Sequence, residues 1–201
     1  MMNNAVFKGF NDKVFDSQDV FRAVLKAMAQ PGQVVTVSSA PTGPSPLMPV
    51  TAGIALSLFD HATPLWLSAQ INNDAVRRYI AFHSRCPLTA QPVEAAFAIL
   101  DGLEVPANFD EFAQGTPEYP DRSTTLIVQV ADLQTGSGCC LSGPGIETNS
   151  YLNVSDVTDH FWASMARNAN NFPLGVDVIL TAGNRLAALP RTTKVKDAAC
   201  M

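Results

Sequence analysis

One acidic residue interrupts an apolar run near the end of the chain, in the stretch FPLGVDVILTAGNRLAALPRTTKV. The acid is Asp177, and the stretch closes on a basic, hydroxyl-rich run that contains Arg191, Thr192 and Thr193. A forked guanidinium beside hydroxyl groups suits the oxygens of a phosphate or phosphonate, so these residues are candidates for anion binding. The same run is also typical of a solvated strand end or of a contact between subunits.

Asp177 needs a partner, because an ionised carboxylate that is buried alone in a sheet costs several kcal/mol. It either holds backbone amides or an arginine of this or a neighbouring chain, or it serves a ligand or catalytic role. The length of the turn between the two strands of the closing stretch decides which residue lies opposite Asp177. A two-residue turn at Gly183 and Asn184 places Asp177 opposite Pro190, with Arg191 on the other face. A three-residue loop that includes Arg185 instead places Asp177 directly opposite Arg191.

Two further side chains are candidates for anion binding or subunit contact. Arg22 lies four residues before Lys26, so both should occupy one flank of the first helix. His83 lies on the helix that follows the polar triplet of residues 72–74, whose side chains suit a helix start. Packing or capping is the simpler interpretation of His83.

Other motifs of catalysis are missing from the sequence. The segment Ser142–Gly145 lacks both the dinucleotide-binding spacing and the ending of a phosphate-binding loop, so we expect a turn there. No GxSxG motif occurs. The three histidines lie too far apart for a metal motif, and we expect no bound metal. No residue is therefore assigned a catalytic role.

Alternating strands and helices should position these residues. We expect a first helix that is capped by Asp16 or Ser17, a second capped by Thr51, and a last one capped by Ser155. In the first helix one apolar stripe is expected to face the core, formed by Val20, Phe21, Val24, Leu25 and Met28. Strands are expected near residues 33–39, 63–68, 94–100, 124–133 and 138–146 and in the closing hairpin. The pattern predicts one layered α/β/α domain over residues 1–201, with a mixed sheet, helices on both faces and an antiparallel element at one side.

Composition narrows the functional classes. The net charge is −5 with 13 scattered basic residues, which argues against nucleic-acid binding. The chain shows no signal peptide and no membrane-spanning run, so a cytoplasmic protein is expected. Only 15% of residues are charged, against about 25% in typical domains, so another subunit should cover part of the surface. The four cysteines show no metal-site spacing and are expected as reduced thiols.

Taken together, several motifs resemble one family. They are FRAVLKAMAQPG, TPLWL followed by NND, FHSRCPL, FAILDG, TLIVQVADL, LSGPGI and the closing stretch quoted above. In this order the chain resembles the H subunit of the bacterial carbon-phosphorus lyase system, PhnH, over nearly its whole length. The resemblance implies a homodimer that also acts with the G, I and J subunits. It implies a step in which an alkylphosphonate replaces the adenine of ATP and gives a ribose 1-phosphonate 5-triphosphate.

The resemblance also implies a fold similar in topology to the large domain of pyridoxal-phosphate-dependent transferases. A pyridoxal enzyme requires a Schiff-base lysine. The five lysines lie near a chain end or on a helix flank, at positions 8, 13, 26, 194 and 196. We therefore expect no bound cofactor. The resemblance implies that the subunit is required for the reaction without an established catalytic group of its own. The alternatives are a free-standing pyridoxal-type or phosphate-handling enzyme and a small-ligand binding module.

Overall fold

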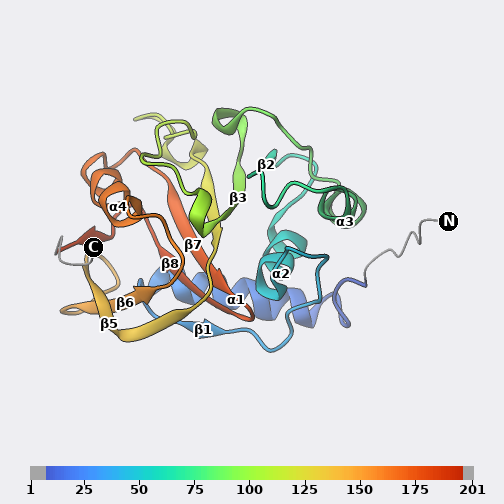
Figure 1. The fold of residues 1–201 in the computed structure, drawn as a ribbon, viewed down its shortest axis with the longest axis horizontal. Coiled ribbons are helices and arrows are strands. Elements are labelled where there is room, and N and C mark those ends of the chain that lie inside the picture. The colour runs from blue at the N-terminus through green and yellow to red at the C-terminus, as the bar shows by residue number, and fades with distance from the viewer. Residues whose placement is uncertain (1–7, 197–201) are drawn as a thin grey trace.

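The computed structural model describes residues 8–196, and within them a six-stranded β-sheet carries helices on both faces, with a three-stranded sheet on the same face as the last helix (Figure 1). The four α-helices are α1 Phe15–Ala29, α2 Pro49–Leu58, α3 Asp74–Ser84 and α4 Phe161–Asn170. Short 3-10 helices cover Pro92–Glu94, Gly102–Glu104 and Pro120–Arg122. The prediction of a mixed α/β fold is confirmed.

The larger sheet has six strands in the order β1-β8-β7-β4-β3-β2. Strands β2, β3, β4 and β7 run parallel, whereas β8 is antiparallel to both of its neighbours. The bounds are β1 Val35–Thr36, β2 Leu65–Leu67, β3 Phe97–Asp101, β4 Thr125–Gln129, β7 Asp177–Ala182 and β8 Arg185–Leu189. The sheet is thus mixed, with its antiparallel strands at one side, as the sequence predicts.

A second, three-stranded sheet corrects the sequence-based expectation. The strand expected near residues 138–146 belongs to β5 Leu133–Ser142, which lies between β6 Ser150–Val154 and β9 Lys194–Val195. All pairs in this sheet are antiparallel. Hydrophobic patterning detects a strand but does not say which sheet it joins, because that choice depends on contacts between distant segments.

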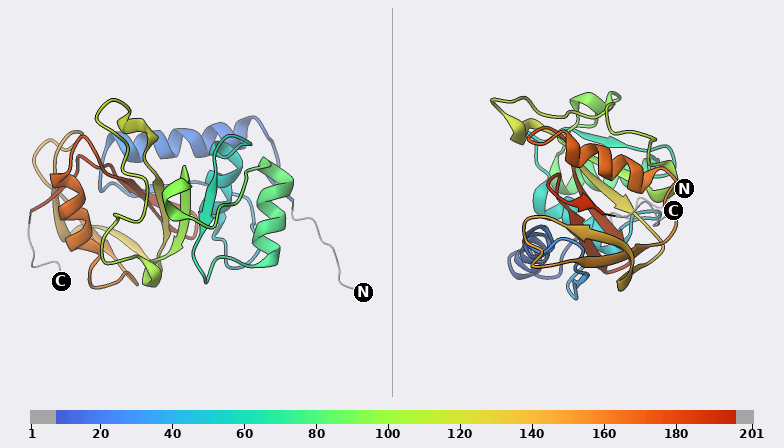
Figure 2. Two further views of the ribbon diagram at one scale, coloured as in Figure 1. Left: turned by 90° about the horizontal axis from the view of Figure 1, so that it is seen from above. Right: turned by 90° about the vertical axis from the view of Figure 1, so that its left-hand side faces the viewer.

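Each face of the six-stranded sheet buries its own hydrophobic cluster. One cluster joins α1, α2 and α3 to side chains such as Ile99, Ile127 and Ile179. The other joins α4 and the three-stranded sheet to the side chains that alternate with these along the strands, such as Leu100 and Val128. Figure 2 shows α1 and α4 on opposite sides of the strands. This arrangement follows from the period of two along each strand.

The first helix buries only part of the expected stripe: Val20 and Val24 are buried and Met28 packs against the core. Its buried residues are Val20, Ala23, Val24 and Ala27. Phe21 and Leu25, which we expected to face the core, are exposed. The small side chains of Ala23 and Ala27 complete the buried face of α1, and Phe21 and Leu25 remain on the outer face.

Helix starts were predicted with mixed success. Asn73 caps α3, because its side chain accepts a hydrogen bond from the Val76 N–H at 3.0 Å. Thr51 does not cap α2; it is buried inside the helix, and its hydroxyl lies 2.9 Å from that of Thr181. The last helix begins at Phe161, so the expected cap at Ser155 is wrong.

The start of α1 also has a different cap from the two expected. The side chain of Asp12 accepts the N–H groups of Val14 and Phe15, so neither Asp16 nor Ser17 serves as the cap of α1. Asp12 satisfies amides that a helix start leaves open, which is why the helix begins before the predicted cap positions.

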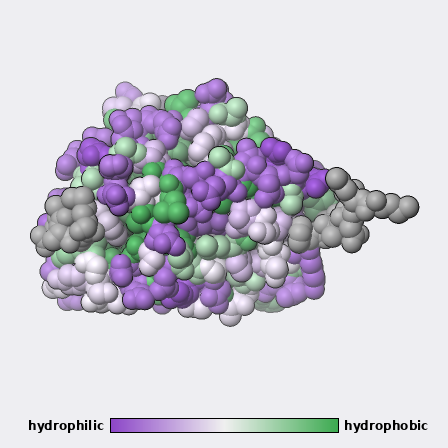
Figure 3. Space-filling view, viewed as in Figure 1, coloured by the Kyte–Doolittle hydropathy of each residue, from purple (hydrophilic) through white to green (hydrophobic). Residues whose placement is uncertain are grey.

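The cysteines, the helices and the molecular surface also bear on the expectations from the sequence. Cys86, Cys139 and Cys140 are buried thiols, and Cys200 lies outside the described residues. No helix within residues 8–196 is long and apolar enough to cross a membrane. Figure 3 shows hydrophilic side chains over most of one face, with hydrophobic ones gathered in small separate patches.

Candidate functional site

Asp177 and Arg191 form an ion pair where β7 begins. The Arg191 Nη2 lies 2.7 Å from the Asp177 Oδ2, and the side chains are only 12% and 19% exposed, respectively. The backbone N–H of Arg191 also donates to Asp177 Oδ1 at 2.8 Å. The acid therefore holds both a backbone amide and a guanidinium of its own chain.

All five N–H groups of the Arg191 guanidinium have acceptors inside the molecule. The Nε donates to Asp177 Oδ1 at 3.3 Å, and Nη2 donates to Asp177 Oδ2 and to the Ser123 hydroxyl. The Nη1 donates to the Pro120 carbonyl at 2.6 Å and to the Pro173 carbonyl at 3.4 Å. Because a guanidinium has five donors, none is left for a phosphate oxygen in this arrangement.

The backbone after β8 explains how Arg191 reaches the acid. Ala182 pairs with Arg185, so Gly183 and Asn184 form the two-residue turn that was one of the two expected registers. That register should place Arg191 on the other face. A tight turn intervenes, in which the Thr193 N–H donates to the Pro190 carbonyl at 2.8 Å, and it redirects Arg191 toward Asp177.

The two threonines of the motif are less accessible than an anion site requires. Thr192 is partly buried, and Thr193 is 1% exposed. The Thr193 hydroxyl has no hydrogen-bond partner among the described residues. These positions join the motif to β9, which pairs with β5.

Arg22 and His83 lie elsewhere. Arg22 is exposed on α1 and forms no ion pair with another residue in the range 8–196. His83 packs on α3, where its ring lies 4.6 Å from the Tyr79 ring and 5.0 Å from the Phe82 ring. Figure 1 shows α3 at the opposite end of the molecule from α4. The structure therefore brings together the closing motif but not these two candidates.

The proline-rich loop of residues 41–48, which precedes α2, covers the carboxyl end of β4. Gln129, the last residue of β4, accepts the Met48 N–H at 2.7 Å and donates to the Pro46 carbonyl at 3.1 Å. The Gly183 N–H donates to the Met48 sulfur at 3.3 Å. Open α/β sheets bind ligands at this edge. Here this chain's own loop occupies the position in front of β4.

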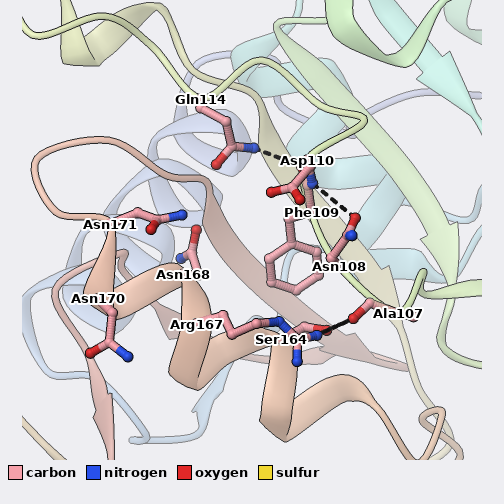
Figure 4. A pocket seen from close by; sticks show the side chains of 10 residues that line it. All are labelled: Ala107, Asn108, Phe109, Asp110, Gln114, Ser164, Arg167, Asn168, Asn170 and Asn171. Atoms are coloured by element: carbon pink, nitrogen blue, oxygen red, sulfur yellow. Dashed lines mark hydrogen bonds between the residues drawn. The ribbon is translucent and has the colours of Figure 1, made fainter.

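A cleft of about 330 Å³ lies between α4 and the segment that follows the Gly102–Glu104 helix. Figure 4 shows its lining, which is rich in carboxamides. Arg167 donates to the Ala107 carbonyl and, at 3.1 Å, to the Ser164 hydroxyl. Asn168 donates to the Val176 carbonyl and accepts the Val176 N–H, both at 2.9 Å. Most of these polar groups hold the loop against α4.

The side chains of the described residues do not fit a pyridoxal cofactor or a metal ion. Lysines 8, 13, 26, 194 and 196 are all exposed, whereas a Schiff base needs a lysine directed into the cofactor pocket. No group of three His, Cys, Asp or Glu side chains in residues 8–196 is placed to hold a metal ion.

Comparison with known proteins shows which family the chain belongs to. The profile of the bacterial phosphonate metabolism protein (PhnH) family matches residues 8–196, which is nearly the whole chain. The chain belongs to the PhnH family. Its resemblance to this family, noted from the motifs, is thereby confirmed.

Two curated relatives support the PhnH assignment. Subunit PhnH of alpha-D-ribose 1-methylphosphonate 5-triphosphate synthase from Rhizobium meliloti (strain 1021) is 41% identical over 188 residues, which cover 93% of this chain and 94% of the relative. The putative C-P lyase subunit protein HtxG of Stutzerimonas stutzeri is 31% identical over 182 residues, covering 89% and 85%. Both relatives are described as subunits.

Sequence reasoning missed the residues that complete the closing PhnH motif. The backbone carbonyls of Pro120 and Pro173 and the hydroxyl of Ser123 accept hydrogen bonds from the Arg191 guanidinium. Backbone carbonyls leave no signal in a sequence. Gln129 was also missed. A polar residue at the end of an apolar strand is the signal that could have marked it, because a buried carboxamide needs partners.

Proposed function

We propose that this chain is the H subunit of a synthase complex that transfers the ribose 5-triphosphate of ATP to an alkylphosphonate and releases adenine. The observation that carries the proposal is the 41% identity, over 93% of the chain, to a relative described as a subunit of alpha-D-ribose 1-methylphosphonate 5-triphosphate synthase. The family profile, which covers residues 8–196, supports the same role in phosphonate metabolism.

We propose that the subunit supports the reaction without a catalytic group of its own. The position in front of β4, at the edge where open α/β sheets bind ligands, is filled by Met48 and Pro46, which Gln129 holds. The Arg191 guanidinium is committed to five internal acceptors. Both observations favour a structural role for the most recognisable motif over an anion site.

The proposed partners are a second copy of this chain and the G, I and J subunits of the complex, in the cytoplasm. The outer face of α1 supports the homodimer, because it exposes Phe15, Phe21 and Leu25 beside Asp19 and Arg22. In a two-fold contact between antiparallel α1 helices, Asp19 of one copy would lie near Arg22 of the other.

We further propose one domain whose topology is similar to that of the large domain of pyridoxal-phosphate-dependent transferases. The shared six-stranded sheet, which carries a hydrophobic cluster on each face, supports the single domain. A free-standing pyridoxal enzyme would show the visible absorbance of a lysine aldimine. The exposure of all five lysines weighs against that alternative. A small-ligand binding module would bind ATP or methylphosphonate without any partner.

Co-expression tests the proposal. A tagged form of this chain is produced with the G, I and J subunits, and the purified material is examined by native mass spectrometry. We expect one complex that contains all four chains, and we expect the isolated chain to release no adenine from ATP and methylphosphonate. Robust turnover by the isolated chain, or purification without any of the other subunits, contradicts the proposal.

A further inference from the structure

Two exposed aromatic side chains lie on neighbouring loops at the amino ends of β4 and β7. Tyr119 is 51% exposed and Phe172 is 61% exposed. Each directly precedes a proline, and the carbonyls of Pro120 and Pro173 accept hydrogen bonds from the same nitrogen of Arg191. The two loops therefore lie side by side, at the end of the molecule that carries α4 (Figure 1).

The loop that carries Tyr119 is held in shape by its own hydrogen bonds. Thr116 and Tyr119 exchange two backbone hydrogen bonds of 3.1 Å each. The guanidinium of Arg122 lies 4.1 Å from the centre of the Tyr119 ring. Next to Phe172, the Leu174 N–H donates to the Asn171 carbonyl at 3.0 Å. An aromatic side chain on such a fixed loop loses little conformational entropy when a partner covers it.

The charges around this aromatic pair are mostly acidic. Segment 105–122 contains four exposed acids and one base, namely Asp110, Glu111, Glu118, Asp121 and Arg122. Segment 171–176 carries no charge. Asp110 shares the cleft of Figure 4 with Asn171, the residue before Phe172.

This charge pattern argues against a second copy of the same chain as the occupant. A two-fold contact brings the same surface of both copies together, so acids would face acids. Like charges that face each other across an interface are unfavourable, and complementary charges fix the choice of partner. The pattern suits a different protein whose apolar pocket is flanked by lysine or arginine.

We propose that Tyr119 and Phe172, framed by Glu118 and Asp121, are the docking site for a different, basic subunit of the synthase complex. This inference rests on the proposed function and adds the surface and the charge of the partner. Arg191 is then a positioning residue. It does not contact the partner, but it fixes the relative position of the two loops through the carbonyls of Pro120 and Pro173.

The experiment co-expresses the tagged chain with the G, I and J subunits and compares variants by quantitative co-purification. The double variant Tyr119→Ala, Phe172→Ala should weaken assembly roughly tenfold or more, because exposed aromatics at interface centres dominate binding. Its thermal unfolding should match that of the wild type, since neither ring is buried. Phe82→Ala is the matched control, because Phe82 is 64% exposed on α3, far from this surface, and it should assemble like the wild type.

Charge gives an independent readout. The double variant Glu118→Lys, Asp121→Lys should weaken assembly, and raising the salt concentration to about 0.5 M should weaken assembly of the wild type but affect this variant less. Self-association of the isolated chain should be the same in the wild type and in the aromatic double variant.

The outcomes separate the two proposals. If the wild type assembles and the aromatic double variant assembles equally well, the docking inference is wrong while the proposed function stands. If the aromatic double variant instead loses self-association, the occupant is a second copy and the inference is again wrong. If the wild type does not assemble at all, the proposed function fails and the docking inference fails with it.

Discussion

The Asp177 carboxylate accepts both the backbone N–H and the guanidinium of Arg191, and the pair joins the start of β7 to the chain that leaves β8. The same guanidinium reaches two further loops, at Pro120 and Pro173. The partly buried acid in this apolar strand is thus explained by an arginine of the same chain. The closing motif holds four segments together at one end of the sheet.

Removal of this arginine should destabilise the fold. Arg191→Ala leaves Ser123 and two carbonyls without this donor and leaves Asp177 with only the backbone N–H, so the free energy of unfolding should fall by about 2–4 kcal/mol. Arg191→Lys should recover only part of the loss, because a single ammonium cannot reach all of these acceptors. Urea unfolding monitored by tryptophan fluorescence measures both values.

An exposed ion pair provides the control. Arg77 and Asp74 pair on the surface of α3, with side chains 45% and 76% exposed. Arg77→Ala should leave the unfolding midpoint almost unchanged. If Arg191→Ala unfolds at the same urea concentration as Arg77→Ala, the closing motif is not a structural joint.

The proline-rich loop should depend on one carboxamide. Gln129→Leu keeps the size of the side chain but removes both hydrogen bonds to the loop, leaving the Met48 N–H and the Pro46 carbonyl without that partner. We expect a loss of about 2 kcal/mol and faster proteolytic cleavage within residues 41–48. Gln134→Leu, at an exposed position, should change neither. Equal protease resistance in both variants would show that Gln129 does not hold the loop.

Stability should decline in alkaline solution. Burial raises the pKa of the Cys86 thiol from 9.0 to about 11, against the opposing effect of its hydrogen bond to Thr63. Burial also raises the pKa of the Tyr79 hydroxyl from 10.0 to about 12. Above pH 9.0 the unfolded chain loses these protons before the folded chain does. The free energy of unfolding should therefore fall as the pH rises from 9.0 to about 12.

The contribution of the thiol can be isolated. In Cys86→Ala the decline in stability between pH 9.0 and about 11 should be shallower than in the wild type. Urea unfolding across this pH range measures the slope. An unchanged slope would mean that the thiol does not titrate differently in the folded and unfolded states.

Self-association should depend on the outer face of α1. Leu25→Glu places a charge in the exposed apolar surface, so the proposed homodimer should dissociate to monomers while the fold is retained. Sedimentation velocity measures the mass. Phe82→Glu introduces the same charge at another exposed apolar site and should leave the dimer intact. A Leu25→Glu protein that remains dimeric excludes α1 as the contact.

Sequence patterns predicted those features that depend on neighbouring residues. The Gly183-Asn184 turn and the Asn73 cap are short-range, and both alternation and turn chemistry point to them. The assignment of β5 to a second sheet and the exposure of Phe21 depend on what packs alongside, which periodicity does not encode.

In the candidate site, too, only the features that depend on neighbouring residues were predictable. The sequence predicted that Asp177 needs a partner, and Arg191 was one of several alternatives. The way in which Arg191 reaches the acid was not predicted, because a turn after the hairpin overrides the strand register. Its remaining acceptors are backbone carbonyls of Pro120 and Pro173, which no pattern of side chains reveals.

Adenine release by the purified complex, with and without this chain, bears most directly on its role as a supporting subunit. The G, I and J subunits are prepared with and without the chain and supplied with ATP and methylphosphonate, and free adenine is quantified by chromatography. We predict phosphonate-dependent adenine release only when the chain is present, and none from the chain alone. Equal release by the complex that lacks the chain would contradict this role.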